Sequence, residues 1–248
     1  MRAFARELLE LLLPSRCAGC GRGADAGAAL CVRCEARLPR VAAHACPRCQ
    51  AVAAPSAGAP CAPCAACAAA RAAGDPLDAC CAAVWFEGDA ARYVRRFKYA
   101  SPGLAGWDPG AEAVARRLIP EAAARVPGPA PDALVPVPLH PARVRRRGFA
   151  PAAILAAALA RGLRVPVVAV LGRRRDTPSQ TGLDRPARRA NVAGCFAAVR
   201  PLPGPEVWLI DDVVTTGATL GEAARVLRAA GARRVAAVCL ARTPAPPC

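Results

Sequence analysis

The sequence predicts an α/β protein: a mainly parallel sheet with flanking helices, preceded by a small cysteine-rich segment that binds metal. Three observations lead to this prediction. From residue 80 onward, short apolar runs alternate with segments of helical periodicity, as in parallel sheets that are covered on both faces. Residues 17–67 contain repeated Cys-x2-Cys pairs. Asp211 and Asp212 end an apolar run and precede a turn rich in threonine and glycine.

The metal-binding prediction rests on four regularly spaced Cys-x2-Cys pairs, because two such pairs complete a tetrahedral zinc site. Few large apolar side chains lie in this segment, so structural zinc would supply folding free energy on the order of 10–16 kcal/mol per site. We expect two zinc ions, paired in sequence order, with interleaved pairing as the alternative. The expected ligands are Cys17, Cys20, Cys31 and Cys34 in one site and Cys46, Cys49, Cys61 and Cys64 in the other. Cys67, three residues further on, either replaces Cys64 or is free, and His44 is a weaker candidate.

We expect an N-terminal helix and a double zinc-ribbon domain in residues 1–74, and the α/β domain in residues 75–248. Apolar runs predict its strands, and mixed apolar and polar periodicity predicts its helices. The last helix is expected to end at Gly231, since glycine favours helix C-termini. The expected elements are, in order, a strand at 82–86, helices at 90–99 and 112–126, a strand at 133–137, a helix at 151–164, strands at 165–171 and 207–210, a helix at 219–231 and a strand at 234–240.

Length and charge narrow the function. The 248 residues suffice for one large and one small domain, and the formal net charge is +16. Lys98 is the only lysine, and the arginines cluster at 143–147, 173–175 and 185–189. Such a balance suits polyanions, namely nucleic acid, phosphorylated metabolites or an anionic membrane surface. The alternative is a solvated arginine surface that reflects a GC-rich coding sequence.

The longest apolar stretch near the N-terminus, Leu8–Leu13, is much shorter than the roughly 20 residues that a membrane-spanning helix needs. It also lacks the cleavage site of a signal peptide. We therefore expect no transmembrane segment and a cytoplasmic protein. In that compartment, fourteen cysteines favour metal binding over disulfides.

The stretch 207–220 carries the strongest functional signal, because it reads as a strand, a tight loop and a helix N-terminus. Backbone N–H groups at a helix start lack partners and suit a phosphate, and Gly217 permits close backbone approach. Two carboxylates suit hydroxyl groups or a hydrated cation instead. The pattern predicts a ligand with a phosphate at one end and a diol at the other, such as a ribose 5-phosphate. The alternative is an ordinary turn capped by Asp and Thr.

This run, Asp-Asp-x-x-Thr-Thr-Gly-x-Thr, resembles the phosphoribosyl pyrophosphate (PRPP) loop of type I phosphoribosyltransferases. The resemblance implies that Asp211 and Asp212 hold the ribose hydroxyls, with Mg²⁺ between ribose and pyrophosphate oxygens. It implies that the 5-phosphate is bound by Val214, Thr215, Thr216, Gly217, Ala218 and Thr219. It further implies that the pyrophosphate meets the loop of Val137, Pro138, Leu139 and His140, through backbone N–H groups of this loop.

Further motifs are similar to those of the competence protein F (ComF, ComFC) family. They are the double Cys-x2-Cys head, Phe97-Lys98-Tyr99, Arg146-Arg147-Gly148-Phe149, Arg175-x-Thr177-x-Ser179-Gln180 and Arg188-x2-Asn191-Val192-x-Gly194. Ala150 and Pro151 stand where the family pattern has Asn-Gln. The resemblance covers nearly the whole chain. It implies a double zinc ribbon joined to a phosphoribosyltransferase domain, with a role in DNA uptake and natural transformation.

Residues 173–191, which we call the hood, are long, polar and arginine-rich, and we expect them to cover the ligand. The expected contacts to phosphate or DNA are Lys98, Arg146, Arg147, Arg175, Gln180, Arg188 and Asn191. Expected partners are PRPP, single-stranded DNA, and competence-machinery proteins such as a DNA translocase. Tyr93 and Phe149 are expected to join arginines in binding single strands.

Two alternatives to a DNA-handling protein stay open. One is an active phosphoribosyltransferase in nucleotide salvage or repair, in which Mg²⁺ and arginine stabilise the departing pyrophosphate. Only Asp211, Asp212 and His140 are candidate general bases for it, and the acceptor is unknown. The other is a sensor in which PRPP controls partner binding without chemistry.

Overall fold

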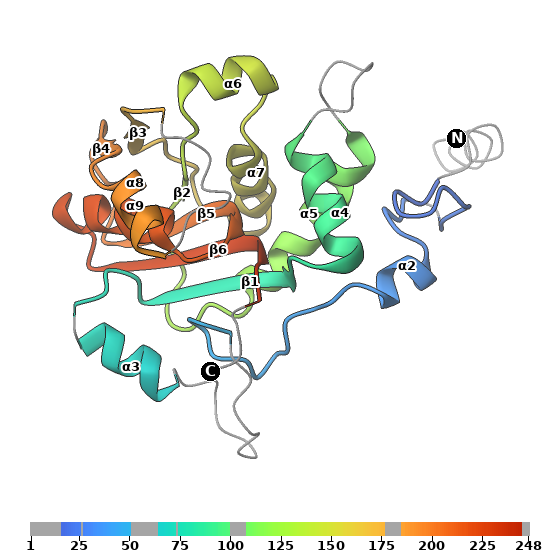
Figure 1. Ribbon diagram of the computed structural model, residues 1–248, viewed down its shortest axis with the longest axis horizontal. Coiled ribbons are helices and arrows are strands. Elements are labelled where there is room, and N and C mark those ends of the chain that lie inside the picture. The colour runs from blue at the N-terminus through green and yellow to red at the C-terminus, as the bar shows by residue number, and fades with distance from the viewer. Residues whose placement is uncertain are drawn as a thin grey trace.

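The computed structural model describes residues 16–25, 27–50, 64–72, 74–99, 108–176 and 185–244 (Figure 1). Its centre is a sheet with the strand order β1-β6-β5-β2. The strands are β1 (Ala79–Trp85), β6 (Arg234–Arg242), β5 (Glu206–Val214) and β2 (Ala133–Pro136), and every neighbouring pair is parallel. The predicted parallel sheet is therefore confirmed.

Helices cover both faces of this sheet, as its continuous apolar strands require. On one face lie α4 (Gly88–Lys98), α5 (Pro109–Ala123) and α7 (Pro151–Leu163), around a core that includes Ile119 and Leu155. On the other face lies α9 (Ala218–Ala229), with Leu220 and Leu227 in a second core, and α8 (Arg185–Val192) beside it. The predicted helices of the α/β domain thus appear, with shifted ends.

A small antiparallel pair, β3 (Leu171–Arg173) and β4 (Phe196–Ala198), brackets the hood. In Figure 1 this pair lies together with α8 and α9, away from α4 and α5. Residues 177–184 of the hood lie outside the described residues. The described residues 185–191 of the hood belong to α8, which packs beside α9, so the hood is not only a loop.

The predicted buried strand at 165–171 is wrong. Val167 makes only an isolated parallel bridge to Leu134, and its side chain is 40% exposed. Leu134 N–H donates to the Pro166 carbonyl and Val168 N–H donates to the Leu134 carbonyl, both at 2.9 Å. Pro166 has no N–H to donate, and the segment lies at the outer edge of β2, so no ladder continues from the bridge.

The cysteine-rich segment covers the other edge of the sheet, along β1. Val41 N–H donates to Ala83 at 3.1 Å, Trp85 N–H to Pro39 at 2.7 Å and Cys80 N–H to Pro47 at 2.8 Å. Two short helices belong to this segment, α2 (Val32–Ala36) and α3 (Ala65–Ala72). None of the helices in the described part of the chain has the length and apolarity that a membrane crossing requires.

Candidate functional site

Both acidic residues lie inside β5, which runs four residues beyond the predicted strand end, to Val214. Side chains alternate along a strand, so the two carboxylates leave the sheet on opposite faces. Asp212 forms an ion pair with Lys98 of α4. Asp211 instead lies near enough to Arg173, in the hood strand β3, for its charge to oppose the lowering of the Arg173 pKa by burial. The site therefore draws residues from both sides of the sheet.

Asp212 is held by an ion pair. Lys98 Nζ lies 2.8 Å from Asp212 Oδ1, and the two side chains are 20% and 12% exposed. Burial lowers the pKa of Lys98, but the charge and hydrogen bond of Asp212 outweigh burial and leave that pKa raised. Lys98, expected to contact phosphate or DNA, is thus directed to the acidic pair.

Asp211 is the unusual acid of the site. Burial and the neighbouring Asp212 charge raise the pKa of Asp211 to about 7, against the opposing influence of Lys98 and Arg173. Its Oδ1 accepts a 2.8 Å hydrogen bond from Asp212 N–H. A carboxyl group poised near neutrality can accept from a hydroxyl group or lose its proton to a cation.

The predicted phosphate loop joins β5 to α9. Gly217, at the N-cap of α9, has φ +79°, and its position offers no side-chain cap. Among the described residues, none accepts a hydrogen bond from the backbone N–H of Thr215 or Gly217, and a methyl group on Gly217 would meet no atom within 4 Å. The loop therefore offers unpaired donors to open space at the start of a helix, which suits an anion.

The predicted pyrophosphate segment is only partly available. Val137 N–H donates to the Ile210 carbonyl at 2.9 Å, and Pro138 has no N–H. Leu139 and His140 supply the remaining backbone donors, for which the described part of the chain contains no acceptor. His140 Nδ1 accepts from Ala142 N–H at 3.3 Å and caps α6 (Pro141–Arg147), so this nitrogen is not a free base.

Among the other candidates, Arg147 lies over the Tyr99 ring, with 5.1 Å from guanidinium carbon to ring centroid. Arg146 is exposed at the end of α6, Arg175 donates to the Ala193 carbonyl, and Asn191 is half-buried in α8. Gln180 and the Arg188 side chain lie outside the described residues.

Arg173 is a residue that the sequence did not single out. Its guanidinium lies 5.5 Å from the Phe196 ring centroid, and burial lowers its pKa. The charge of Arg173 acts to lower the pKa of Asp211. An arginine cluster was visible in the sequence, but only the β3–β4 pairing turns this member toward the acidic pair.

Two sets of four cysteines form the candidate metal centre, each with its sulfurs within 4.8 Å of one another. Zinc–sulfur bonds of about 2.3 Å place tetrahedral sulfurs about 3.8 Å apart. Cys20 and Cys31 Sγ are 3.8 Å apart, and Cys49 and Cys64 Sγ are 3.5 Å apart, so both sets fit structural zinc. The sets are Cys17, Cys20, Cys31 and Cys34, and Cys46, Cys49, Cys64 and Cys67.

The first set and the sequential pairing agree with the prediction, but the second set differs from it. Cys67 joins Cys64, and neither replaces it nor stays free. The predicted ligand Cys61 lies outside the described residues. Cys67 N–H donates to the Cys64 carbonyl at 2.9 Å as α3 begins, and this turn brings the two sulfurs to one side.

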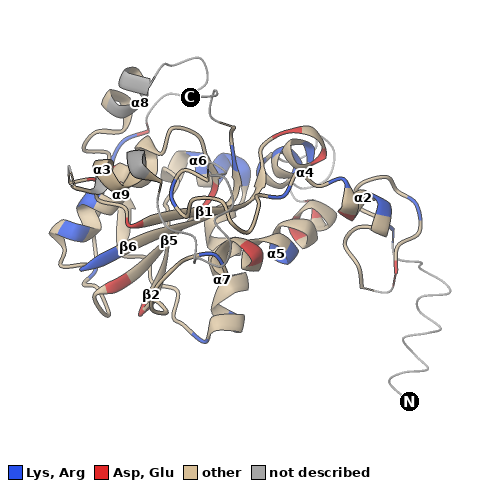
Figure 2. Cartoon of the chain, turned by 90° about the horizontal axis from the view of Figure 1, so that it is seen from below, with Lys and Arg blue, Asp and Glu red and all other residues tan. Residues whose placement is uncertain are grey.

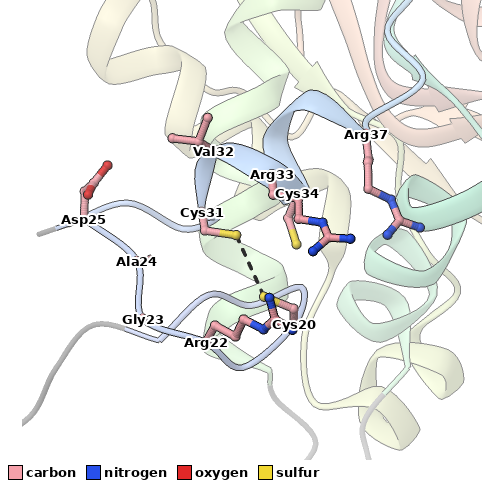
Figure 3. Close-up of a pocket in the computed structure, with 10 residues that line it drawn as sticks. All are labelled: Cys20, Arg22, Gly23, Ala24, Asp25, Cys31, Val32, Arg33, Cys34 and Arg37. Carbon is pink, nitrogen blue, oxygen red and sulfur yellow. Dashed lines mark hydrogen bonds between the residues drawn. The ribbon is translucent and has the colours of Figure 1, made fainter.

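The first set lies beside a cavity of about 560 Å³, into which Arg22, Arg33 and Arg37 face (Figure 3). Four thiolates around Zn²⁺ carry a net charge of about −2, so these arginines complement the site. Burial raises the pKa of Cys17, but bonds from the Cys31 and Gly19 N–H groups outweigh it and lower that pKa to about 6. Both features favour the thiolate that metal requires.

Comparisons with known proteins agree with this architecture. Residues 8–80 match the family model of the double zinc ribbon domain, and residues 144–247 match that of the phosphoribosyl transferase domain. Together with the parallel sheet and the cysteine sets, these matches define the class: a phosphoribosyltransferase domain that carries an N-terminal double zinc ribbon.

Similar curated proteins narrow the class further. Competence protein F of Haemophilus influenzae is 37% identical over 116 residues, which are 45% of this chain and 51% of the relative. DNA utilization protein YhgH of Salmonella typhi is 39% identical over 137 residues, 54% of this chain and 60% of the relative. YhgH of Escherichia coli strain K12 is 38% identical over 114 residues, which are 46% of this chain and 50% of the relative. The chain is thus similar to proteins named for competence and DNA utilization, and its matches span about half the length of these relatives.

Proposed function

We propose that this protein binds PRPP with Mg²⁺ and handles single-stranded DNA during DNA uptake. The main observation that supports this proposal is the acidic pair beside the phosphate loop. Two carboxylates in β5 are followed within five residues by the unpaired N–H groups of Thr215 and Gly217, just before α9. PRPP offers a diol to the carboxylates and a 5-phosphate to the N–H groups. Asp211 would also hold the cation, since carboxylate oxygen suits Mg²⁺.

DNA binding is supported by an exposed face of α4. Arg92 and Arg95 are exposed and follow at i and i+3, so they share one side of the helix, and Tyr99, which directly follows α4, is 61% exposed. Arg147 of α6 lies over Tyr99. In Figure 2, Lys and Arg positions are blue on both α4 and α6. Guanidinium groups beside an exposed ring suit the phosphates and bases of single strands. The names of the relatives, competence and DNA utilization, agree with this proposal.

The aromatic residues expected to bind DNA lie elsewhere. Tyr93 is 2% exposed in the core, and the Phe149 ring is 6.2 Å from Phe97. Both stabilise the fold, so Tyr99 takes their place in the proposal.

Phosphoribosyl transfer is a second candidate function. It is favoured by Arg173, a half-buried cation near Asp211 that can stabilise charge on departing pyrophosphate. The acceptor is not defined by any described side chain. A cytoplasmic location, a DNA translocase as partner and a domain boundary near residue 75 belong to the same proposal.

Calorimetry with PRPP and Mg²⁺ tests the main proposal. Wild type should bind, the double variant Asp211→Asn/Asp212→Asn should not, and Glu121→Gln on the far side of α5 should bind like wild type. Single-stranded DNA added before titration should change PRPP affinity if both ligands act together. A wild type that binds no PRPP overturns the proposal.

A further inference from the structure

Gln50 directly follows Cys46 and Cys49, the first Cys-x2-Cys pair of the second metal set, and it is 1% exposed. Its φ of +61° is left-handed, a conformation that non-glycine residues rarely adopt without a supporting environment. Gln50 N–H donates to the Cys46 carbonyl at 2.9 Å and closes the metal-binding turn. The turn therefore fixes the direction in which the Gln50 amide points.

Both ends of that amide bind strands of the central sheet. Nε2 donates to the Ala82 carbonyl in β1 at 3.0 Å, and Oε1 accepts from Arg242 Nε in β6 at 2.7 Å. Arg242 Nη2 donates in turn to the carbonyl oxygens of Arg48 at 2.8 Å and Cys80 at 3.0 Å. Arg48 and Gln50 flank Cys49, so the guanidinium of Arg242 is held on both sides of a metal ligand.

The backbone of Arg242 lies at the base of the phosphate loop. Arg242 is in register with Val214, the last residue of β5, and Thr243 N–H donates to the Val214 carbonyl at 3.0 Å. The phosphate loop begins at the next residue, Thr215. One residue of β6 therefore binds the second ribbon through its side chain and supports the loop through its backbone.

The first ribbon docks elsewhere. Arg92 Nη2 donates to the Gly19 carbonyl at 3.4 Å and Arg96 Nη1 to the Ala18 carbonyl at 2.7 Å, both from α4. Arg40 joins the segment between the ribbons to α5 through Glu121, at 2.8 Å. Among the described contacts, only the second ribbon reaches the end of β6.

We propose that the second zinc ribbon positions the phosphate loop through Gln50 and Arg242, so that anion binding at the loop depends on the second metal set. This inference rests on the proposed PRPP site and adds its regulation. Gln50 and Arg242 are positioning residues, since neither reaches the ligand itself. Metal that closes the turn at Cys46 and Cys49 holds Gln50, Gln50 holds Arg242, and Arg242 holds the strand end from which the loop starts.

The test uses full-length, zinc-loaded protein. Gln50→Met keeps the volume but removes the amide, and Arg242→Lys keeps the charge but cannot bridge the same oxygens. Arg40→Met is the matched control, because it removes a head contact to Glu121 of α5 and leaves Gln50 and Arg242 unchanged. For each variant, zinc content, hydrogen exchange of the amides at 213–220 and PRPP affinity are measured.

Gln50→Met and Arg242→Lys should retain two zinc ions, exchange faster at 213–220 and bind PRPP about tenfold more weakly, the factor for losing one hydrogen bond to a charged group. Arg40→Met should match wild type in exchange and affinity. Wild-type exchange at 213–220 in both test variants overturns the inference. If wild type binds no PRPP, the proposed function fails, and the exchange data still decide the coupling. If Gln50→Met does not fold, Arg242→Lys decides.

Discussion

Lys98 Nζ lies 2.8 Å from Asp212 Oδ1, so the only lysine of the chain is bound to one carboxylate of the candidate site. This pair makes the two neighbouring acids different. Asp212 has a cation at hydrogen-bond distance, whereas burial and the Asp212 charge raise the pKa of Asp211 to about 7. Strand β5 thus carries one carboxylate that is held in an ion pair and one that exchanges its proton near neutral pH.

Lys98→Met should destabilise the protein by about 2–4 kcal/mol, because it leaves the Asp212 carboxylate nearly buried without its cation. Denaturant unfolding measures the loss. The double variant Lys98→Met/Asp212→Asn should recover most of it, since no charge then remains unpaired. Equal midpoints for Lys98→Met and wild type would show that solvent already satisfies Asp212.

The raised pKa of Asp211 predicts a defined pH dependence. Its carboxyl group has a pKa of about 7 in the folded protein, whereas the ordinary pKa of this group is 3.8. The folded state therefore binds more protons between these values, and stability falls as pH rises through this window. Asp211→Asn should lack this loss, so its stability advantage over wild type should grow from pH 3.8 to about 7. Parallel pH profiles for the two proteins would contradict the assignment.

Zinc content should distinguish Cys61 from Cys67. Cys67→Ser removes a sulfur from the second set and should lower the stoichiometry from two zinc ions toward one. Cys61→Ser should keep both ions, because four other thiols complete that set. Mass spectrometry under native conditions counts the ions. The reverse result would restore Cys61 as the fourth ligand.

The α4 surface should carry a salt-dependent part of DNA binding. Arg95→Gln/Arg147→Gln removes two cations of this surface and should reduce the slope of log affinity against log salt by about 1.4 for single strands. Arg161→Gln, an exposed change on α7, is the control and should leave the slope nearly unchanged. Titrations of a fluorescent oligonucleotide at several salt concentrations give the slopes. An unchanged slope in the double variant would show that DNA binds to another surface of the protein.

Much of the fold follows from local patterns. The strands β1, β2 and β6 are apolar over most of their length, and α9 is followed by a glycine, so periodicity and end signals suffice to predict them. In β5 the apolar run predicts only the first part of the strand, because the strand continues through Asp211 and Asp212 to Val214. The segment 165–171 has the same apolar composition and is nevertheless not a strand. Whether such a run pairs depends on its neighbours in space, which its own residues do not encode.

The candidate site shows the same division. The acidic pair and the phosphate loop are contiguous, so the motif was visible in the sequence. The Lys98–Asp212 pair joins residues more than a hundred positions apart, and it depends on how α4 crosses the sheet. The choice between Cys61 and Cys67 depends on where α3 begins, because both have the required spacing from Cys64.

The segment around Arg40 and Pro47 also protects the sheet. It binds the outer edge of β1, whose sequence, Ala-Cys-Cys-Ala-Ala-Val-Trp, is apolar and uncharged. Once uncovered, such an edge is a template for pairing with another chain, because its backbone groups and side chains favour intermolecular β-structure. Metal loss would therefore expose this edge and lead to aggregation. The ribbons act as a cover that keeps the folded α/β domain in solution.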